Sequence, residues 1–507
     1  MINKTFIKLL SAVIMMTAAM CMTSCGGDDP KPTEPPGSEA PTEPSEPEQE
    51  NILAFDIVDG EVEVRCVSDT VTEVKIPSEV TIDGATYSVT TIAQDGFRNL
   101  ASLKTLHVPS SIRFILRNAF YGTPVRDLYI EDLKAWCEIY FEPLWISGNT
   151  YSSFSFDCNP IKAATNIWIK GEMVEEDFEI PEGVTKIGQG AFTNLKYRRV
   201  KFPSTLEMID FRAFQGCKNL DELSFGENLT EICNGSFYEC GSLRSVTLPS
   251  SLEYLGFDAF HNEDRSGIRV NICSLEWWAG LKGTGSHETP YYFYVDGKEL
   301  SDVDLTIPED VTDIRSYAFY NMPGIRSVTF HDGVKSIGEG AFSYCKGLKE
   351  LRLPSSLESI GKEAFRNCEG LESLVIPPCK LKRIEEYTFS NCTGLKTLYI
   401  PEPVEFIGMI AFSNCDSLEI VTLPSTINNL YWGPFSGCQS LKDVYIKSTT
   451  LPEGCGFTES QEEEFLANII LHVPEGSLDI YRDEDPWKYF KEILETKPED
   501  FPTPEQY

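Results

Sequence analysis

Apolar and polar residues follow one another in a pattern that returns every 22 to 24 residues along most of the chain. One clear copy reads AFSYCKGLKELRLPSSLESIGKEAF, from Ala341 to Phe365, so that the Ala-Phe pair at its start returns at its end. A repeat of this length is typical of arrays in which every copy folds into one structural unit. The pattern therefore predicts a repeat protein.

The phenylalanine that ends each copy marks twelve units, in groups of two, four and six. The anchoring residues are Phe97, Phe120, Phe192, Phe214, Phe237, Phe260, Phe319, Phe342, Phe365, Phe389, Phe412 and Phe435. A unit of this size cannot bury its own apolar face. Stacking the units about 4.7–4.9 Å apart would pair their strands and make a continuous core.

The first half of a unit predicts a strand and a corner. Leu351 and Leu353 alternate with polar neighbours, which is the period of a half-buried strand. Pro354 should end this strand, because it has no N–H to donate to a neighbouring strand. Ser355 and Ser356 follow as the corner.

The second half of a unit predicts a shorter strand and a turn. Leu357 and Ile360 begin a second extended run. Gly361 is expected to turn the chain, and residues 362–367 have room for about one helical turn that points its apolar side chains inward.

These residues resemble the BspA-type leucine-rich repeat, whose units read roughly C-x-x-L-x-x-[LV]-x-[LIV]-P-x-x-[LV]-x-x-I-G-x-x-A-F. The matching positions are Cys345, Leu348, Leu351, Leu353, Pro354, Leu357, Ile360, Gly361, Ala364 and Phe365. The resemblance extends over residues 72–450. It implies a strand-dominated α/β repeat protein, a right-handed leucine-rich-repeat solenoid with a parallel concave sheet and short helical turns, capped at both ends.

Two modified repeats, at residues 121–180 and 261–307, interrupt the solenoid expected over residues 91–450. They resemble each other, since Trp136 of the first matches Trp278 of the second. Both hold a looped-out segment, at 141–160 and 281–290, with aromatic residues within the first and beside the second. The aromatic side chains either pack over the widened repeat or anchor a partner.

The ends of the array are expected to be capped, because open ends would expose core residues and strand edges. Residues 51–90 carry alternating runs that predict a small β cap. Residues 451–507 are expected to form a C-terminal cap and tail, with one last strand at 470–474 and a short terminal helix over 485–495.

Residues 1–24 predict a targeting segment. Lys4 and Lys8 precede an apolar run that is too short for a secure membrane span. The following Cys25 resembles the lipidated cysteine of bacterial lipoproteins, and residues 25–50 form an acidic linker rich in Pro and Glu. This resemblance implies a lipid-anchored protein of the bacterial outer membrane, exposed at the surface. The acidic residues after Cys25 are either a surface-export signal or the start of the linker.

The net charge of −35 argues against nucleic acid or anionic lipid headgroups as partners, so the lipid anchor is the only membrane contact expected. Seven of the 16 cysteines lie three residues after an anchoring phenylalanine. These are Cys217, Cys240, Cys345, Cys368, Cys392, Cys415 and Cys438. A thiol there behaves as a small buried hydrophobe, although disulfides or a metal remain alternatives.

We expect neither an enzyme nor a bound cofactor. The chain has five histidines, no two of them at helical metal-ligand spacing, and it lacks the G-x-S-x-G, phosphate-loop and EF-hand motifs. Candidate ligand-binding residues instead form two outward rows on the concave sheet. They are Arg352, Tyr399, Thr422 and Tyr445 in one row and Glu350 and Thr397 in the other. These side chains equally suit an ordinary solvated sheet, because Thr and Tyr are good strand formers.

The sequence thus favours a cell-surface lipoprotein that binds extracellular proteins. Resemblance to the BspA-type family implies adhesion to host matrix proteins or to other cells. The alternatives are a glycan-binding lipoprotein in polysaccharide capture, in which Tyr399 and Tyr445 would hold the sugar, and an architectural envelope protein without a specific ligand.

Overall fold

The computed structural model describes residues 52–145, 154–262, 267–283, 291–454, 457 and 462–503. The chain divides into residues 1–48 and 49–507, and all described residues lie in the second unit. Cys25 and the expected linker therefore lie outside the described residues. Among the described helices, none has the length and apolarity that a membrane span requires.

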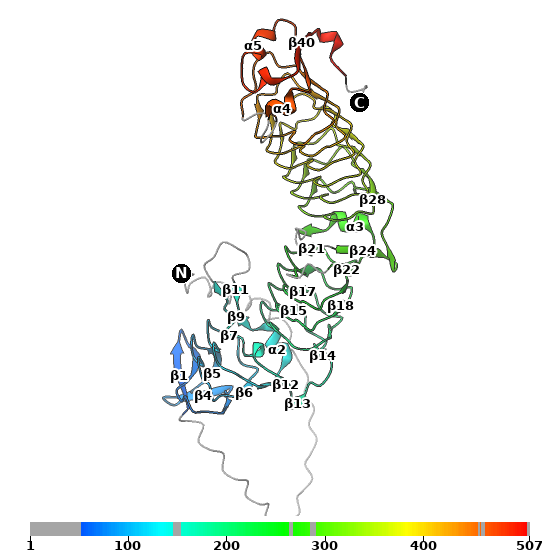
Figure 1. Cartoon of the computed structure of the whole chain (residues 1–507). Helices are drawn as coiled ribbons and strands as arrows, with labels where there is room; N and C mark the ends of the chain where they lie inside the picture. The colour runs from blue at the N-terminus through cyan, green and yellow to red at the C-terminus, as the bar shows by residue number, and fades with distance from the viewer. Residues whose placement is uncertain are drawn as a thin grey trace, which may run out of the picture. The chain divides into compact units, whose positions relative to one another are not determined.

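Each regular unit contributes two short strands, which confirms the expected strand-dominated solenoid. The longer strands pair in parallel from one unit to the next and form a series that we call sheet 1. The shorter strands form a second parallel series, sheet 2. Figure 1 shows the successive turns of the chain lying on one another from β14 to α4.

Sheet 1 is divided into hydrogen-bonded segments. In order, these contain β3 (Glu73–Lys75), β6 (Thr105–Val108), β8 (Asp127–Ile130), β12 (Asn166–Ile169) and β13 (Glu172–Met173); β14 (Phe178–Glu179) and β16 (Val200–Lys201); β18 (Glu222–Ser224), β20 (Ser245–Thr247), β22 (Ile268–Asn271), β24 (Tyr291–Val295) and β25 (Lys298–Glu299); β26 (Val303–Thr306), β28 (Ile325–Thr329), β30 (Glu350–Arg352) and β32 (Ser373–Val375); and β34 (Thr397–Tyr399), β36 (Ile420–Leu423), β38 (Asp443–Ile446), β39 (Ile470–Pro474) and β40 (Glu492–Thr496).

Sheet 2 is divided in the same way. Its segments contain β1 (Leu53–Val58), β2 (Glu61–Cys66), β4 (Glu79–Ile82), β5 (Ala85–Ile92), β7 (Phe114–Ile115) and β9 (Tyr140–Phe141); β15 (Lys186–Ile187), β17 (Met208–Ile209), β19 (Glu231–Ile232), β21 (Tyr254–Leu255) and β23 (Lys282–Gly283); β27 (Asp313–Ile314), β29 (Ser336–Ile337) and β31 (Ser359–Ile360); and β33 (Arg383–Ile384), β35 (Phe406–Ile407) and β37 (Asn429–Leu430). A separate hairpin joins β10 (Leu144–Trp145) and β11 (Phe154–Ser155).

The third side of each unit consists of turns, so the helical turn expected at residues 362–367 is wrong. Glu363 and Asn367 have φ values of 57° and 59°, which a right-handed helix cannot contain. Alternate N–H groups here donate to the next unit, as in Phe365 N–H to Thr388 O at 2.8 Å. The backbone of this segment therefore forms a third ladder that links neighbouring units.

The anchoring phenylalanines form a stacked column through the core. The ring of Phe365 lies 5.3 Å from Phe342 and 5.2 Å from Phe389, with interplanar angles of 2° in both pairs. The column continues through Phe412 and Phe435. All five rings are buried, so the anchoring position of the repeat supplies the centre of the solenoid.

The Ser-Ser corner binds each unit to the one before it. Ser355 donates to a carboxylate oxygen of Asp332 at 2.9 Å, and Ser356 donates to the carbonyl oxygen of Val334. The same arrangement recurs, with a carboxylate of one unit accepting from the first Ser of the next. The recurring pairs are Glu182–Ser204, Glu227–Ser250 and Glu402–Ser425, whereas Ser110 donates to Glu131 of the unit that follows it.

These hydrogen bonds between serine hydroxyls and carboxylates should make the stability of the solenoid depend on pH. Burial raises the pKa of Glu402, but hydrogen bonds from Thr426 and Ser425 outweigh it and lower the pKa overall. The stability that such a carboxylate contributes is complete above its unfolded pKa of about 4.3 and is lost as pH falls through the lowered folded value.

We therefore expect Glu402→Gln to reduce the loss of stability between about pH 6 and about pH 3, measured by urea unfolding at each pH. Glu172→Gln, which changes an exposed carboxylate on β13, serves as the control. An identical pH dependence in Glu402→Gln and the unmodified chain would contradict a stabilising role for this pair.

The repeat cysteines form a ladder of buried thiols. Each Sγ donates to the carbonyl oxygen of the anchoring phenylalanine in the preceding unit, for example Cys368 to Phe342 at 3.2 Å. Burial raises the pKa of Cys345 and Cys392 to about 12. Every cysteine that the structure describes is a free thiol, and no group of described residues could hold a metal ion.

These thiols should be unreactive until the chain unfolds, because only the thiolate is nucleophilic. We expect Ellman titration without reductant to find the seven ladder thiols only after guanidinium is added. If these thiols remain unreactive toward Ellman's reagent after denaturation, they are joined in disulfide bonds.

The two modified repeats each place a short helix where a regular unit has a turn. These are α2 (Leu133–Glu138), capped by Asp132, and α3 (Leu275–Gly280), capped by Ser274. Trp136 of α2 donates its indole N–H to Ala191 O at 3.0 Å, and Trp278 of α3 donates to Ala318 O in the same way.

Most described aromatic side chains of these repeats pack inward. Phe141, Phe156, Tyr291 and Phe293 are buried, whereas Tyr292 is exposed. An antiparallel hairpin arm, β13 in one repeat and β25 in the other, then ends the segment of sheet 1. The modified repeats therefore interrupt sheet 1 while the apolar core continues.

The ends of the described chain differ from one another. At the N-terminal end, β1 pairs antiparallel with β2, which pairs in parallel with β5. At the other end, a strand at 470–474 is present as expected, but the prediction of a terminal helix over 485–495 is wrong. Residues 487–489 form a single 3-10 turn and β40 then pairs in parallel with β39. The sequence Glu-Ile-Leu-Glu-Thr can add a strand to the edge that β39 offers.

Three further short elements complete this end. They are α4 (Glu462–Leu466), α5 (Leu478–Arg482) and a 3-10 turn at Pro498–Asp500. Trp487 and Phe490 both pack edge-on against Phe457, with centroid separations of 5.3 Å. These rings cover the end of the phenylalanine column, because Phe457 stacks on Phe435 at 5.6 Å.

Candidate functional site

The predicted ligand-binding rows lie on the outer surface of sheet 1, but the structure does not make them one uniform site. Arg352 and Glu350 project from β30 and are exposed. Thr397 and Tyr399 on β34 are half-buried. The rows are therefore open at β30 and partly covered further along.

The prediction that Thr422 faces a ligand is wrong. Parallel pairing places Thr422 between Tyr399 on one strand and Tyr445 on the other. The Thr422 side chain is fully buried, because the larger tyrosines flank it on both sides. Alternation along a strand gives the direction of a side chain, but the neighbours on adjacent strands decide whether solvent reaches it.

The rings of Tyr399 and Tyr445 are engaged by the chain itself. Tyr445 stacks on His472 with centroids 4.0 Å apart and an interplanar angle of 10°, and Phe501 lies edge-on at 6.2 Å. The ammonium of Lys447 lies 4.9 Å from the centre of the Tyr399 ring and donates to its hydroxyl at 3.0 Å. These contacts occupy surfaces of the rings that a sugar would need for stacking.

A second stack, which the sequence analysis missed, lies on β6, β8 and β12. His107 stacks on Tyr129 at 4.1 Å, and Tyr129 stacks on Trp168 at 5.1 Å, with interplanar angles of 14° and 9°. His107 also contacts the carboxylate of Glu73 at 3.0 Å. The signal was present, because the residue between the last two apolar strand positions is aromatic in three successive units. Since the rings cover one another, the faces between them are closed to a sugar.

A cleft of about 390 Å³ lies where β13 ends the first segment of sheet 1. Thr165, Asn166 and Tyr197 are among its lining residues, and the Tyr197 hydroxyl donates to Val174 O at 2.9 Å. The equivalent cleft beside β24 measures only about 70 Å³. Tyr291 and Tyr292, which line this cleft, occupy the positions of Thr165 and Asn166.

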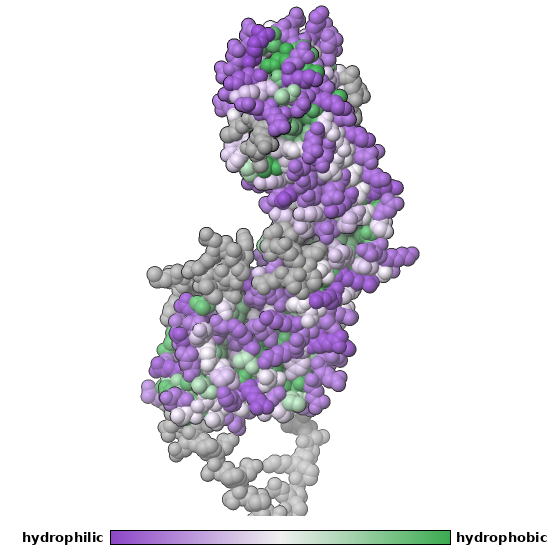
Figure 2. Space-filling model, viewed as in Figure 1, coloured by the Kyte–Doolittle hydropathy of each residue, from purple (hydrophilic) through white to green (hydrophobic). Residues whose placement is uncertain are grey.

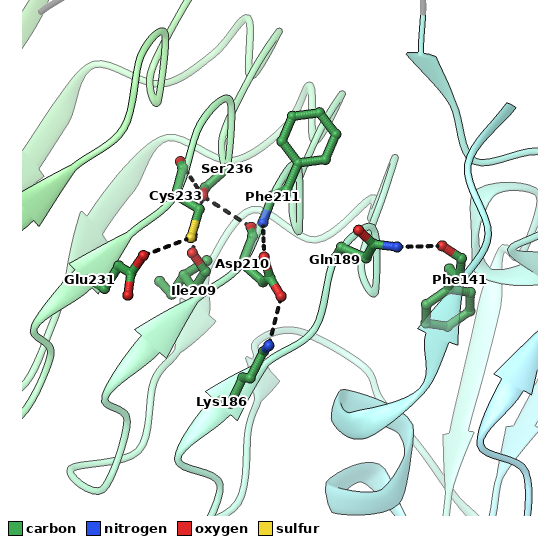
Figure 3. A network of polar contacts seen from close by, with 9 residues as sticks. All are labelled: Phe141, Lys186, Gln189, Ile209, Asp210, Phe211, Glu231, Cys233 and Ser236. Carbon is green, nitrogen blue, oxygen red and sulfur yellow. Dashed lines mark hydrogen bonds and ion pairs between the residues drawn. The ribbon is translucent and has the colours of Figure 1, made fainter. Parts of the chain in front are cut away.

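Polar groups gather on sheet 2 between the first modified repeat and the units that follow (Figure 3). Lys186 pairs with Asp210 at 2.8 Å, and the Cys233 thiol donates to Glu231 at 3.3 Å. Ser236 donates to the carbonyl oxygen of Cys233 at 2.7 Å. Separately, Gln189 donates to Phe141 O of the modified repeat at 2.9 Å (Figure 3).

This network contains nucleophilic residue types, but its geometry is structural. Ser236 is fully buried and donates to backbone carbonyls, so no base accepts its proton. Burial, with smaller contributions from Asp210 and Glu231, raises the pKa of Cys233 and keeps the thiol protonated. A reactive cysteine requires the opposite environment.

A family model described as the BspA-type leucine-rich repeat region matches the chain at residues 70–142, 173–274, 298–392 and 359–461. These ranges include more than half of the sequence, and they contain the phenylalanine column, the thiol ladder and most strands of both sheets. The chain belongs to this family.

Several solved structures resemble this BspA-type repeat protein. A leucine-rich repeat protein from Bacteroides ovatus is 21% identical, with 74% of this chain and 94% of that chain covered and a TM-score of 0.36. A leucine rich cell surface protein from Faecalibacterium prausnitzii is 20% identical, with 80% and 95% covered and a TM-score of 0.38. The pneumococcal vaccine antigen PcpA is 17% identical, with 88% and 98% covered and a TM-score of 0.36.

None of the curated proteins matches this BspA-type chain.

Hydrophilic residues cover much of the face drawn in Figure 2, with apolar residues in smaller areas between them. On sheet 1, the exposed side chains of β30 are the part of the predicted rows that a large partner can reach.

Proposed function

We propose that this chain is a surface-exposed lipoprotein of the bacterial outer membrane whose solenoid binds extracellular proteins. One observation carries this proposal. Parallel strands present outward side chains unit after unit, as Glu350 and Arg352 are presented on β30, while Ser236 and Cys233 are held in unreactive surroundings. An extended surface of repeated outward side chains suits the recognition of a macromolecule.

The proposed lipid anchor depends on acylation of Cys25. The names of two similar proteins, a cell surface protein and a vaccine antigen, support a surface location for this chain. We expect Cys25→Ser to move the protein from the membrane fraction to the soluble fraction. Fractionation of cells producing each form measures this, and protease treatment of intact cells tests exposure. Retention of the variant in the membrane fraction would contradict lipid anchoring at Cys25.

Adhesion to host matrix proteins or to other cells is the binding activity that we propose. An array of matrix proteins and glycans, probed with the purified chain at physiological salt, tests it. We expect selective capture by a protein, unchanged after that protein is deglycosylated. Capture by one class of sugar would replace this proposal with glycan binding, against which the covered rings of Tyr399 and Tyr445 argue. A silent array would favour an architectural role.

A further inference from the structure

An exposed aromatic corner lies at sheet 2, away from the predicted rows. We define the aromatic corner as Phe406, Ile410, Tyr431 and Trp432. Tyr431 and Trp432 are 45% and 49% exposed. The rings of Phe406 and Tyr431 lie 6.2 Å apart, and Ile410 N–H donates to Trp432 O at 3.2 Å. Two successive units therefore bring one apolar surface together.

The repeat fold does not require aromatic residues at these positions. Lys362 and Glu386 occupy the position of Trp432 in earlier units of the same group, and Gly361 and Glu385 occupy that of Tyr431. Those units form the same turns and the same ladders as the last two. The corner is thus an addition to the pattern.

The backbone at the corner is strained. Ile410 has a φ of 57° and Trp432 a φ of 30°, in the left-handed region that β-branched and bulky residues avoid. The position of Ile410 is left-handed in other units too, where it carries Gly340 and Glu363, whereas the position of Trp432 carries Lys362 and Glu386, which have no positive φ. Apolar residues that raise the free energy of the fold while remaining accessible to solvent point to a binding function.

The net negative charge of the units that form the corner favours a cationic partner. Residues 381–454 carry eight Asp and Glu against five Lys and Arg, and the whole chain has a net charge of −35. The guanidinium of Arg383 already lies 3.7 Å from the centre of the Phe406 ring, which shows that a cation fits against this surface. Exposed Trp and Tyr rings attract further cations, and the surrounding negative charge steers them there.

We propose that the aromatic corner binds a cationic polypeptide segment of the partner, with Lys or Arg side chains against the rings of Trp432 and Tyr431 and an apolar side chain against Ile410. This rests on the proposed function as a protein-binding lipoprotein. The acidic surroundings disfavour acidic glycans and anionic lipids. An apolar residue beside the rings favours a polypeptide that alternates cationic and apolar side chains.

Fluorescence anisotropy of labelled peptides about twelve residues long, titrated with the full chain at physiological salt, tests this. The probes are an alternating Arg-Leu peptide, an Arg-Ser peptide and a Glu-Leu peptide. We expect the Arg-Leu peptide to bind most tightly and the Glu-Leu peptide not to bind. Trp432→Ala should weaken Arg-Leu binding about tenfold, because truncated aromatic anchors have effects of this size.

Tyr121→Ala is the matched control, since Tyr121 is 46% exposed and also has an arginine, Arg98, over its ring. It should leave the affinity unchanged. Tyr431→Ser is a second corner variant, and thermal unfolding verifies that each variant is folded. Equal affinity of the unmodified chain and both corner variants, or no binding of the Arg-Leu peptide, would overturn the proposed site. The protein array distinguishes that result from failure of the proposed function, because capture of a matrix protein would still stand.

Discussion

Replacing Phe365 with Ala should lower the free energy of unfolding by roughly 3–5 kcal/mol. The ring is fully buried and lies between Phe342 and Phe389 at 5.3 and 5.2 Å. Backbone ladders fix the chain on both sides, as in Phe342 N–H to Ala364 O at 2.7 Å, so the cavity cannot collapse. Lost contacts and the remaining void both contribute to the loss.

Urea unfolding together with hydrogen exchange measures this effect. Because neighbouring units stabilise one another, amide protection should fall most in the units of Phe342 and Phe389 and least near the N-terminal β1. Phe365→Leu, which keeps most of the apolar volume, should cost less than the alanine variant. A loss below about 1 kcal/mol in Phe365→Ala would contradict the importance of the column.

Gly361→Ala should destabilise the protein by about 3 kcal/mol, at the upper end of the range for overpacking. A Cβ atom at Gly361 would lie 2.4 Å from the backbone N of Glu339 and 2.7 Å from the carbonyl carbon of Gly338. Backbone atoms cannot move aside as a flexible side chain does, so the two units would have to separate. Urea unfolding of the purified variant measures the change.

Gly241→Ala is the control for this prediction. The nearest atom to its added Cβ is the side-chain oxygen of Asn262, at 3.8 Å, so the methyl group fits. We expect the stability of this control to stay within about 0.5 kcal/mol of the unmodified chain. Equal stability of the two variants would show that close approach does not explain the glycine at 361.

Sequence periodicity predicted the parts of the fold that one unit determines. The alternation of Leu351 and Leu353 gave a strand of sheet 1, and the spacing of the phenylalanines gave the core column. Gly361 was expected to turn the chain, whereas the structure needs it for the close approach of two backbones. That distance belongs to two units at once, so the pattern within one unit does not contain it.

Contacts between neighbouring units also explain which predictions from the sequence were wrong. The helical turn at residues 362–367 has a helix-compatible composition, but hydrogen bonds to the next unit hold Glu363 and Asn367 in the left-handed region. Thr422 is covered by tyrosines from adjacent strands. The terminal strand β40 forms because β39 offers it an edge. In each case a contact between neighbouring turns overrides the local signal.

The three backbone ladders between units have a mechanical consequence. Within each sheet segment, a unit holds the next through sheet 1, sheet 2 and the turn ladder. A pulling force applied along the chain would therefore detach one turn after another from an end of the array. A turn of 23 residues extends to at most about 80 Å, so stretching a single molecule would give a series of steps of roughly that length. Such an array can lengthen under load and dissipate energy before a bound partner is released.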